Sequence, residues 1–325
     1  MYQSKLNLID TEIAIKTLKM VFESSLTDQL NLLRVSAPVF LEANTGLNDD
    51  LCGNENPISF TVSNQQIELV HSLAKWKRFA LYKYEIQKNS GIYTDMNAVR
   101  SCEKRDNTHS FYVDLWDWEK VISIEDRNMD TLISAVKKVY NCILDTEQVI
   151  CKKYPQLKLK LPTEITIVST QELEDMFPSL TPDEREYEIT TMHKAVFITQ
   201  IGGLLKSGNM HRYKAPDYDD WSLNGTMLFY HEPLNQVLSI SSMGIRVDID
   251  ILNKQLIATD TVVRSELNFH KMIFNELLPL SIGGGLGQSR LSMFLLEKIH
   301  IGEVQVSVWS EDTIKNCAGE RIFLL

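Results

Sequence analysis

The chain has 325 residues, 44% of them apolar, so it can bury a hydrophobic core of ordinary size as one large domain or two. Its 43 acidic and 33 basic side chains give a net charge of −10, which provides no general positive field for phosphates and disfavours DNA or tRNA as a partner. No apolar stretch approaches the roughly 18 residues that a membrane helix needs, and residues 1–10 lack the pattern of a secretory signal.

The cysteines are scattered along the chain and include no Cys-x-x-Cys pair. An odd, dispersed set fits a reducing compartment and argues against both a disulfide framework and a zinc cage. We therefore expect a cytoplasmic protein. The five residues are Cys52, Cys102, Cys142, Cys151 and Cys317.

The first elements combine helical and extended patterns. Apolar side chains recur at helical spacing between residues 10 and 30, and the segment Leu32 to Phe40, with Pro38 near its end, indicates a strand. The segment His71 to Glu85 predicts a helix for which Ser72 is a plausible N-cap.

A hairpin and a second long helix follow. Ile92 to Arg100 and Ser110 to Trp118 predict two antiparallel strands, and residues 128–153 predict an amphipathic helix. No repeat or long linker interrupts the chain, so we expect a single catalytic domain, residues 1–325, of the α+β class with an antiparallel sheet flanked by helices. Further strands are expected at 164–169, 195–200, 226–230, 236–241 and 278–282, and further helices at 181–192, 266–275 and 289–298.

The most distinctive local segment is the glycine cluster at residues 282–290, IGGGLGQSR. Missing side chains let a flat or anionic ligand approach the backbone, and the pattern predicts a strand that breaks into glycines before a helix opens. It is no Walker A loop, because no Gly-Lys-Ser/Thr follows, and Gln288 stands where the Rossmann pattern requires glycine. Arg290, one helical turn in, can stack on a base and reach phosphate; a surface arginine on a glycine-rich helix start is the alternative.

A second candidate is Arg100, at the end of a predicted hairpin strand whose partner carries Tyr112, Asp114 and Asp117. An arginine fixed on a strand can hold an α-phosphate and an attacking carboxylate together. A cross-strand ion pair on the surface is the simpler interpretation of Arg100 alone.

Three further segments are rich in charge or hydroxyl groups. Residues 71–78, HSLAKWKR, suit an anionic ligand, although most basic helix faces are only solvated. Residues 215–221, APDYDDW, supply carboxylates for an ammonium group or a cation, or form a solvated turn. Residues 241–248, SSMGIRVD, offer two hydroxyls and an arginine for an α-carboxylate.

Taken in order, these segments resemble known proteins. Helix–strand–proline, strand–arginine–hairpin and glycine cluster–helix–arginine are similar to the three motifs of class II aminoacyl-tRNA synthetases. HSLAKWKR, APDYDDW, SSMGIRVD and IGGGLGQSRL look like segments of ammonia-dependent asparagine synthetase, and the resemblance runs from about Glu12 to HIGEVQVSVW near the C-terminus. It implies a homodimer with the class II core, no anticodon-binding domain, and small-molecule substrates.

The resemblance implies a reaction in two steps that uses ATP and Mg²⁺. The β-carboxylate of aspartate attacks the α-phosphate of MgATP to give β-aspartyl-AMP and pyrophosphate, and ammonia then displaces AMP. Carried over by position, Arg100 would clamp the α-phosphate, and ATP would be held by Arg100, Gly283, Gly284, Gly285 and Arg290. The aspartate and ammonia pocket would be lined by Asp49, Ser72, Lys77, Asp117, Asp219, Ser242 and Arg246, with Arg246 for the α-carboxylate and Asp219 as a proton acceptor.

Three positions depart from the pattern of that family. Leu115 stands where glutamine would face the substrate side chain, and Thr226 and Ser239 stand where an aspartate and a glutamate would hold the ATP magnesium. Hydroxyls are poor replacements for carboxylates as magnesium ligands. The alternatives are that neighbouring groups take over, or that the chain is a diverged paralogue that adenylates another carboxylate or binds ATP or an amino acid without turnover. The sequence does not identify the magnesium ligands.

Overall fold

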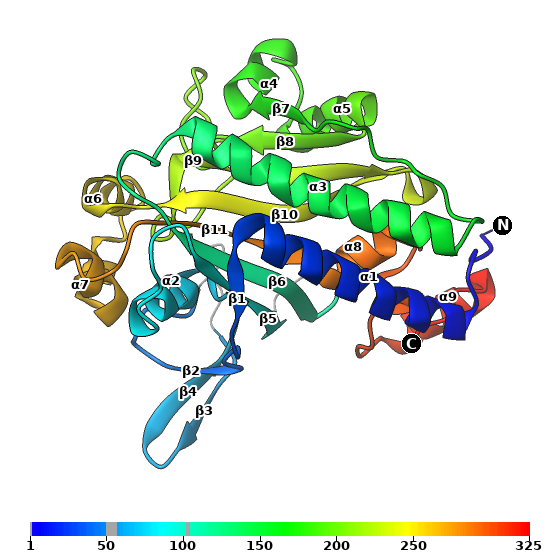
Figure 1. The fold of residues 1–325 in the computed structure, drawn as a ribbon, viewed down its shortest axis with the longest axis horizontal. Helices are drawn as coiled ribbons and strands as arrows, with labels where there is room; N and C mark the ends of the chain where they lie inside the picture. The colour runs from blue at the N-terminus through cyan, green and yellow to red at the C-terminus, as the bar shows by residue number, and fades with distance from the viewer. Residues whose placement is uncertain (1, 50–56, 102–104) are drawn as a thin grey trace.

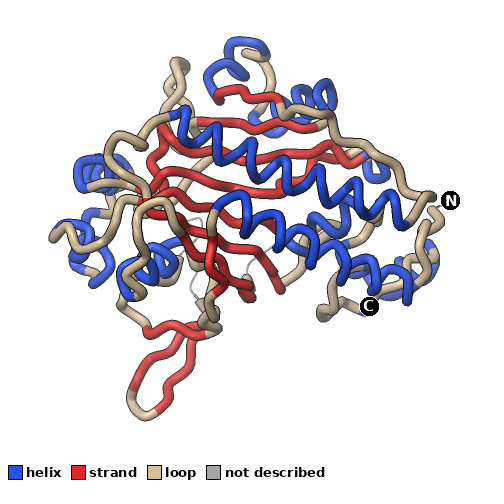
Figure 2. The backbone as a smooth tube through the Cα atoms, in the orientation of Figure 1, coloured by secondary structure: helices blue, strands red, loops and turns tan. Residues whose placement is uncertain are grey.

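The computed structural model describes residues 2–49, 57–101 and 105–325, so Cys52 and Cys102 lie outside the described residues. Its centre is an eight-stranded sheet with the order β1-β5-β6-β11-β10-β9-β8-β7 (Figures 1 and 2). All pairs from β5 across to β8 are antiparallel, while β1 and β7 run parallel to their neighbours at the two edges. The predicted α+β class is confirmed, with one parallel pair at each edge. The strands are β1 (Leu32–Arg34), β5 (Gly91–Val99), β6 (Tyr112–Val121), β7 (Thr166–Ser169), β8 (Ala195–Thr199), β9 (Asp219–His231), β10 (Gln236–Arg246) and β11 (Ser281–Gly287).

Two long helices cover one face of this sheet. The helices α1 (Leu8–Leu30) and α3 (Met129–Lys153) lie side by side across the strands, as Figures 1 and 2 show. Each is capped at its N-terminus by an asparagine side chain, Asn7 and Asn128, that accepts a backbone N–H of the first turn. Both helices were expected from their apolar spacing, and both are confirmed.

The layer between these helices and the sheet is the main hydrophobic core. Phe22 of α1 packs on Trp116 of β6 with ring centroids 4.4 Å apart, and Trp118 is fully buried two residues further along the strand. Because successive strand residues face opposite sides, Leu115, Asp117 and Glu119 point away from this core. The core on one face of β6 therefore fixes a row of chemically different side chains on the other.

A small second sheet adds to the molecule, and the short helix α2 packs on β6 and β11. The small sheet projects from the body of the molecule (Figure 1), and its strand order is β2-β4-β3. Among the described residues, no helix is both long and apolar enough to cross a bilayer. The remaining elements are β2 (Phe40–Glu42), β3 (Ser59–Val62), β4 (Gln65–Leu69), α2 (Ala74–Lys83), α4 (Thr170–Met176), α5 (Pro182–His193), α6 (Ile249–Ala258), α7 (Asn268–Phe274), α8 (Gln288–Leu295) and α9 (Glu311–Glu320).

Three local predictions in the N-terminal third of the chain were wrong. The segment Leu32 to Phe40 is not one strand: β1 pairs with β5 only to Arg34, and Phe40 begins β2 in the small sheet, so the part containing Pro38 connects two sheets. The helix expected from His71 begins at Ala74, and Ser72 does not cap it. Instead, the Ser72 hydroxyl accepts the N–H of Ala74, the first residue of α2, at 3.2 Å.

The glycine cluster is itself a strand rather than a break after one. β11 pairs with β10 on one side and β6 on the other through the glycines, so their backbone groups belong to the ladder. An ideal Cβ on Gly283 would lie 1.9 Å from Glu119 Oε2. The glycines are therefore required because side chains from the neighbouring strands cross over β11.

Candidate active site

A pocket of about 550 Å³ opens on the face of the sheet opposite α1 and α3. Its floor comes from β6, β9, β10 and β11, and among the residues that the structure describes, six lysines or arginines and four aspartates line it. Arginine and lysine side chains therefore reach this cavity even though the chain as a whole carries a net charge of −10, and such side chains can bind anionic groups. Of the residues predicted from sequence, those that line it are Asp49, Ser72, Lys77, Arg100, Asp117, Asp219, Ser242, Arg246, Gly284, Gly285 and Arg290.

Arg246 is the centre of a buried charge network at one end of the pocket. Its Nε and Nη2 donate to Glu119 at 2.6–3.1 Å, and Nη1 donates to Asp219, whose other oxygen pairs with Lys214 at 3.0 Å. Burial alone would lower the pKa of Arg246, but Glu119 and Asp219 raise it above its ordinary value. The result is a permanently charged fork, fixed in orientation, whose edge lines the pocket.

The same network determines the state of Asp219. Burial raises the pKa of this carboxyl, but Lys214 and Arg246 outweigh burial and hold the pKa below its ordinary value. Asp219 therefore stays ionised throughout the physiological range. An ionised carboxylate attracts a cation well and is a weak base.

Lys77 forms a second fixed contact on the pocket floor. Its ammonium group pairs with Asp117 and donates to the carbonyl of Gly284 at 3.0 Å, while Glu119 Oε2 lies 3.9 Å away. Burial lowers the pKa of Lys77, and the neighbouring acids oppose that effect. Lys77 therefore links its own pair with Asp117 to the pair of Arg246 and Glu119, and the two pairs form one continuous network at the pocket floor.

The other cations of residues 71–78 have different partners. Lys75 pairs with Asp217 at 3.1 Å, and Arg78 donates to the carbonyls of Pro279 and Val247 at 2.9 and 2.7 Å. Burial lowers the pKa of Arg78 to about 10. The basic segment is therefore neither a solvated face nor one anion site, since only Lys77 of its cations lines the pocket.

The acidic segment APDYDDW likewise places only some of its charged side chains at the pocket. Asp217 is fully buried against Lys75, Arg264 and His270 at 3.0–3.1 Å and does not line the pocket. Asp219 does line it. Asp219 therefore lies at the pocket, whereas Asp217 forms buried ion pairs away from it.

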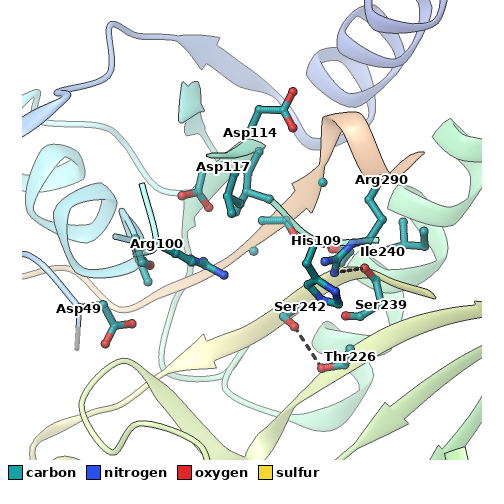
Figure 3. Close-up of a pocket in the computed structure, with 18 of the residues that line it drawn as sticks. Asp49, Arg100, His109, Asp114, Asp117, Thr226, Ser239, Ile240, Ser242 and Arg290 are labelled. Carbon is teal, nitrogen blue, oxygen red and sulfur yellow. Dashed lines mark hydrogen bonds between the residues drawn. The ribbon is translucent and has the colours of Figure 1, made fainter. Parts of the chain in front are cut away.

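The other end of the pocket has hydroxyl groups and arginine. Arg290 donates from Nη1 to the carbonyl of Ser239 at 2.9 Å and from Nη2 to the carbonyl of Thr108 at 3.5 Å. Thr226 and Ser242 share a hydrogen bond of 3.1 Å between their hydroxyls. Figure 3 shows Arg100 and Arg290 reaching toward the pocket from different sides, with Thr226, Ser239 and Ser242 on its floor.

The three departures from the family pattern all line this pocket. Leu115 lies over the glycine strand, with its Cδ1 3.0 Å from the position that a Cβ on Gly285 would occupy. Among the described residues, no group of three or more His, Cys, Asp or Glu is arranged to hold a metal ion. Thr226 and Ser239 offer only neutral hydroxyls, which do not fit the carboxylate preference of Mg²⁺.

Sequence reasoning missed some members of the site and misjudged one glycine. Glu119, fully buried against Arg246, was not identified, although it follows Asp117 by two residues and so had to share its face of the strand. Asp114 accepts the N–H and hydroxyl of Ser289 at 3.0 and 2.7 Å and so ties α8 to β6. Gly283, expected among the ATP contacts, does not line the pocket, because Glu119 and Arg246 cover it.

Comparison with known proteins identifies relatives along the whole chain. The family profile described as aspartate–ammonia ligase matches residues 9–321. The aspartate–ammonia ligase of Fusobacterium nucleatum is 52% identical over 325 residues, covering 100% of this chain and 99% of its own length. That of Clostridium tetani is 52% identical over 327 residues, covering 100% and 96%.

Solved structures show the same fold at much lower identity. The asparaginyl-tRNA synthetase of Pyrococcus horikoshii, complexed with asparaginyl-adenylate, matches with a TM-score of 0.69 at 14% identity, over 92% of this chain and 68% of that chain. The Entamoeba histolytica enzyme gives 0.65 at 16% identity, over 92% and 67%. The fold is that of the class II aminoacyl-tRNA synthetase core, as expected, and the full-length relatives settle the family: this chain belongs to the aspartate–ammonia ligases.

Proposed function

We propose that the chain joins ammonia to the β-carboxylate of L-aspartate at the expense of ATP, giving L-asparagine, AMP and pyrophosphate. The family match over residues 9–321 carries this proposal. Its geometric support is the gathering of Arg100, Arg246 and Arg290 around one pocket. Neither paralogue alternative, another carboxylate or binding without turnover, is favoured by the full-length relatives.

The reaction on this proposal balances in two displacements. A β-carboxylate oxygen bonds to the α-phosphorus while the bond to the bridging oxygen breaks, releasing pyrophosphate. The lone pair of ammonia then attacks the acyl carbon, the bond to AMP breaks, and a proton is lost. Adenylation is needed because a free carboxylate has no competent leaving group.

The aspartate end is assigned to the buried charge network. Arg246 would bind the α-carboxylate, and Asp117 and Asp219 would face the amino group, with Asp49, Ser72, Lys77 and Ser242 completing the lining. Since the pKa of Asp219 is held low, we assign it to attracting ammonium rather than to removing its proton.

The nucleotide end is assigned to Arg100 and Arg290. Arg100 would align the α-phosphate with the attacking carboxylate and neutralise the charge that develops between them. Arg290, held by two carbonyls, would stack on adenine and also reach the phosphates, and Gly284 and Gly285 would let the nucleotide approach the sheet. Magnesium, on this proposal, arrives with ATP as its counterion.

The proposal is tested by aspartate-dependent exchange of labelled pyrophosphate into ATP, followed by asparagine formation on addition of ammonium. Exchange with aspartate and product with ammonium are expected. Exchange only with another carboxylic acid, or none with any acid alongside measurable ATP binding, would contradict the assignment and favour a diverged paralogue.

We further propose that residues 1–325 form one catalytic domain and that this domain acts in the cytoplasm. We also propose that it works as a homodimer, with α1 and β1 at the interface. Large apolar side chains are exposed there, with Ile9 66%, Met20 61% and Leu33 60% accessible. Apolar exposure of this extent on two neighbouring elements is typical of a surface that a partner covers. Light scattering should give twice the chain mass, and Met20→Arg should give monomers; cell fractionation tests the location.

A further inference from the structure

The nucleotide end of the pocket carries hydroxyls where a metal-binding site would need carboxylates. Thr226 and Ser242 are paired with each other across β9 and β10. Ser239 lies on the same strand as Ser242, beyond a register shift, and its carbonyl is taken by Arg290. This part of the floor is therefore neutral.

Three of the four aspartates that line the described part of the pocket have partners of their own. Asp117 is paired with Lys77, Asp219 with Arg246 and Lys214, and Asp114 accepts both donors of Ser289. In Figure 3, Asp49, Asp114 and Asp117 lie on the side of the view away from Thr226 and Ser239. Together with the absence of a metal-holding cluster among the described residues, this leaves the hydroxyl region without a carboxylate pair for a cation.

Positive charge reaches the same region from side chains. Arg290 is fixed there by the carbonyls of Ser239 and Thr108, and Arg100 enters from the end of β5. Guanidinium groups bind phosphate oxygens with directed hydrogen bonds and keep their charge at any physiological pH. They can therefore neutralise a polyphosphate without an ion held by the protein.

We infer that this chain binds the phosphates of ATP through arginine side chains over a neutral hydroxyl floor, with no divalent cation held by the residues that the structure describes, so that its affinity for ATP does not depend on Mg²⁺. The inference rests on the proposed function in that ATP is taken as the ligand. Aspartate and glutamate at positions 226 and 239 would repel the phosphates unless a cation stood between them, so these two positions determine the metal requirement.

The experiment is calorimetric titration of the full-length protein with ATP, once with excess MgCl₂ and once with EDTA. For the unmodified chain we expect the two dissociation constants to agree within about threefold. For Thr226→Asp/Ser239→Glu we expect ATP binding in EDTA to weaken by about tenfold or more and to recover with Mg²⁺. The matched control Ser59→Glu/Thr61→Asp adds the same charge on the exposed strand β3 and should behave as the unmodified chain.

A tenfold loss of affinity in EDTA for the unmodified chain would overturn the inference, and this measurement needs no variant to fold. Equal metal dependence in the two double variants would overturn the role of positions 226 and 239. Pyrophosphate exchange separates this inference from the proposed function. Metal-independent ATP binding without aspartate-dependent exchange would keep the inference and reject the ligase activity. Aspartate-dependent exchange together with Mg²⁺-dependent ATP binding would keep the ligase activity and reject the inference.

Discussion

The two ends of the pocket are built by different means. At the end proposed for aspartate, charged side chains from three strands (β6, β9 and β10) and from α2 are interlocked, with Glu119 and Arg246 almost wholly buried. At the end proposed for the nucleotide, Arg290 is held by backbone carbonyls and the floor is neutral. A buried network is fixed by its own internal pairing, so changes there should alter both folding and aspartate binding. Changes at the nucleotide end should affect ATP alone.

The largest effect is expected from breaking the aspartate end at Glu119. Glu119→Gln leaves the buried charge of Arg246 without its bidentate partner, which should cost about 3 kcal/mol of unfolding free energy and raise the KM for aspartate. Urea denaturation measures the first and initial rates the second. Glu311→Gln, which removes a surface pair with Lys315, is the control and should cost less than about 1 kcal/mol.

A loss below about 1 kcal/mol in Glu119→Gln would mean that the network contributes little to stability. A matching loss of ATP affinity would show that the two ends are not separate.

Arg100 lines the pocket and reaches into it from a different side than Arg290 (Figure 3). Arg100→Ala should reduce pyrophosphate exchange by at least about 10²–10³-fold, because the charge that develops at the α-phosphate loses its alignment and its neutralisation. The exposed Arg321→Ala serves as the control and should exchange normally. Retained exchange in the Arg100 variant would remove this residue from the reaction.

Substitution of Gly283 tests whether the pair of Glu119 and Arg246 requires a residue without a side chain at this position of β11. A methyl group there would meet Glu119 Oε2 at 1.9 Å and Arg246 Nη2 at 2.4 Å, so Gly283→Ala should destabilise the fold by about 1–3 kcal/mol. Gly319→Ala in α9, where a Cβ meets nothing within 4 Å, should instead be neutral or stabilising by up to about 1 kcal/mol. Thermal unfolding compares the two, and equal stabilities would refute the packing argument.

Leu115 lines the pocket, and replacing it tests whether this position contacts the substrate side chain. The family pattern has glutamine here, so Leu115→Gln should supply a hydrogen bond to the substrate side chain and lower the KM for aspartate by about tenfold. Leu115→Met keeps the apolar contact and should change the KM little. An unchanged KM in the glutamine variant would show that this position does not contact the substrate.

The parts that sequence predicted well are those where a local pattern determines the outcome. The spacing in α1 and α3 and the hairpin of β5 and β6 gave the layer and the strand that carry the site. Glu119 was missed because its partner Arg246 is 127 residues away in the chain, and no local pattern reveals a pairing across β11. Asp217 and Asp219, two residues apart, differ in role only because of residues that reach them from α2, α7 and β10.

The smallest effect is expected at the hydroxyl of Ser239. Arg290 is held by the backbone carbonyl of this residue, so Ser239→Ala keeps the contact and should change the ATP dissociation constant by less than about threefold. Arg290→Lys, which replaces the planar fork with a point charge, should weaken ATP binding by about tenfold. Calorimetry on both variants decides between two ways of building the nucleotide end: a tenfold loss in Ser239→Ala would mean that the hydroxyl itself binds phosphate, and the floor would then act as a ligand rather than a neutral surface beneath the arginines.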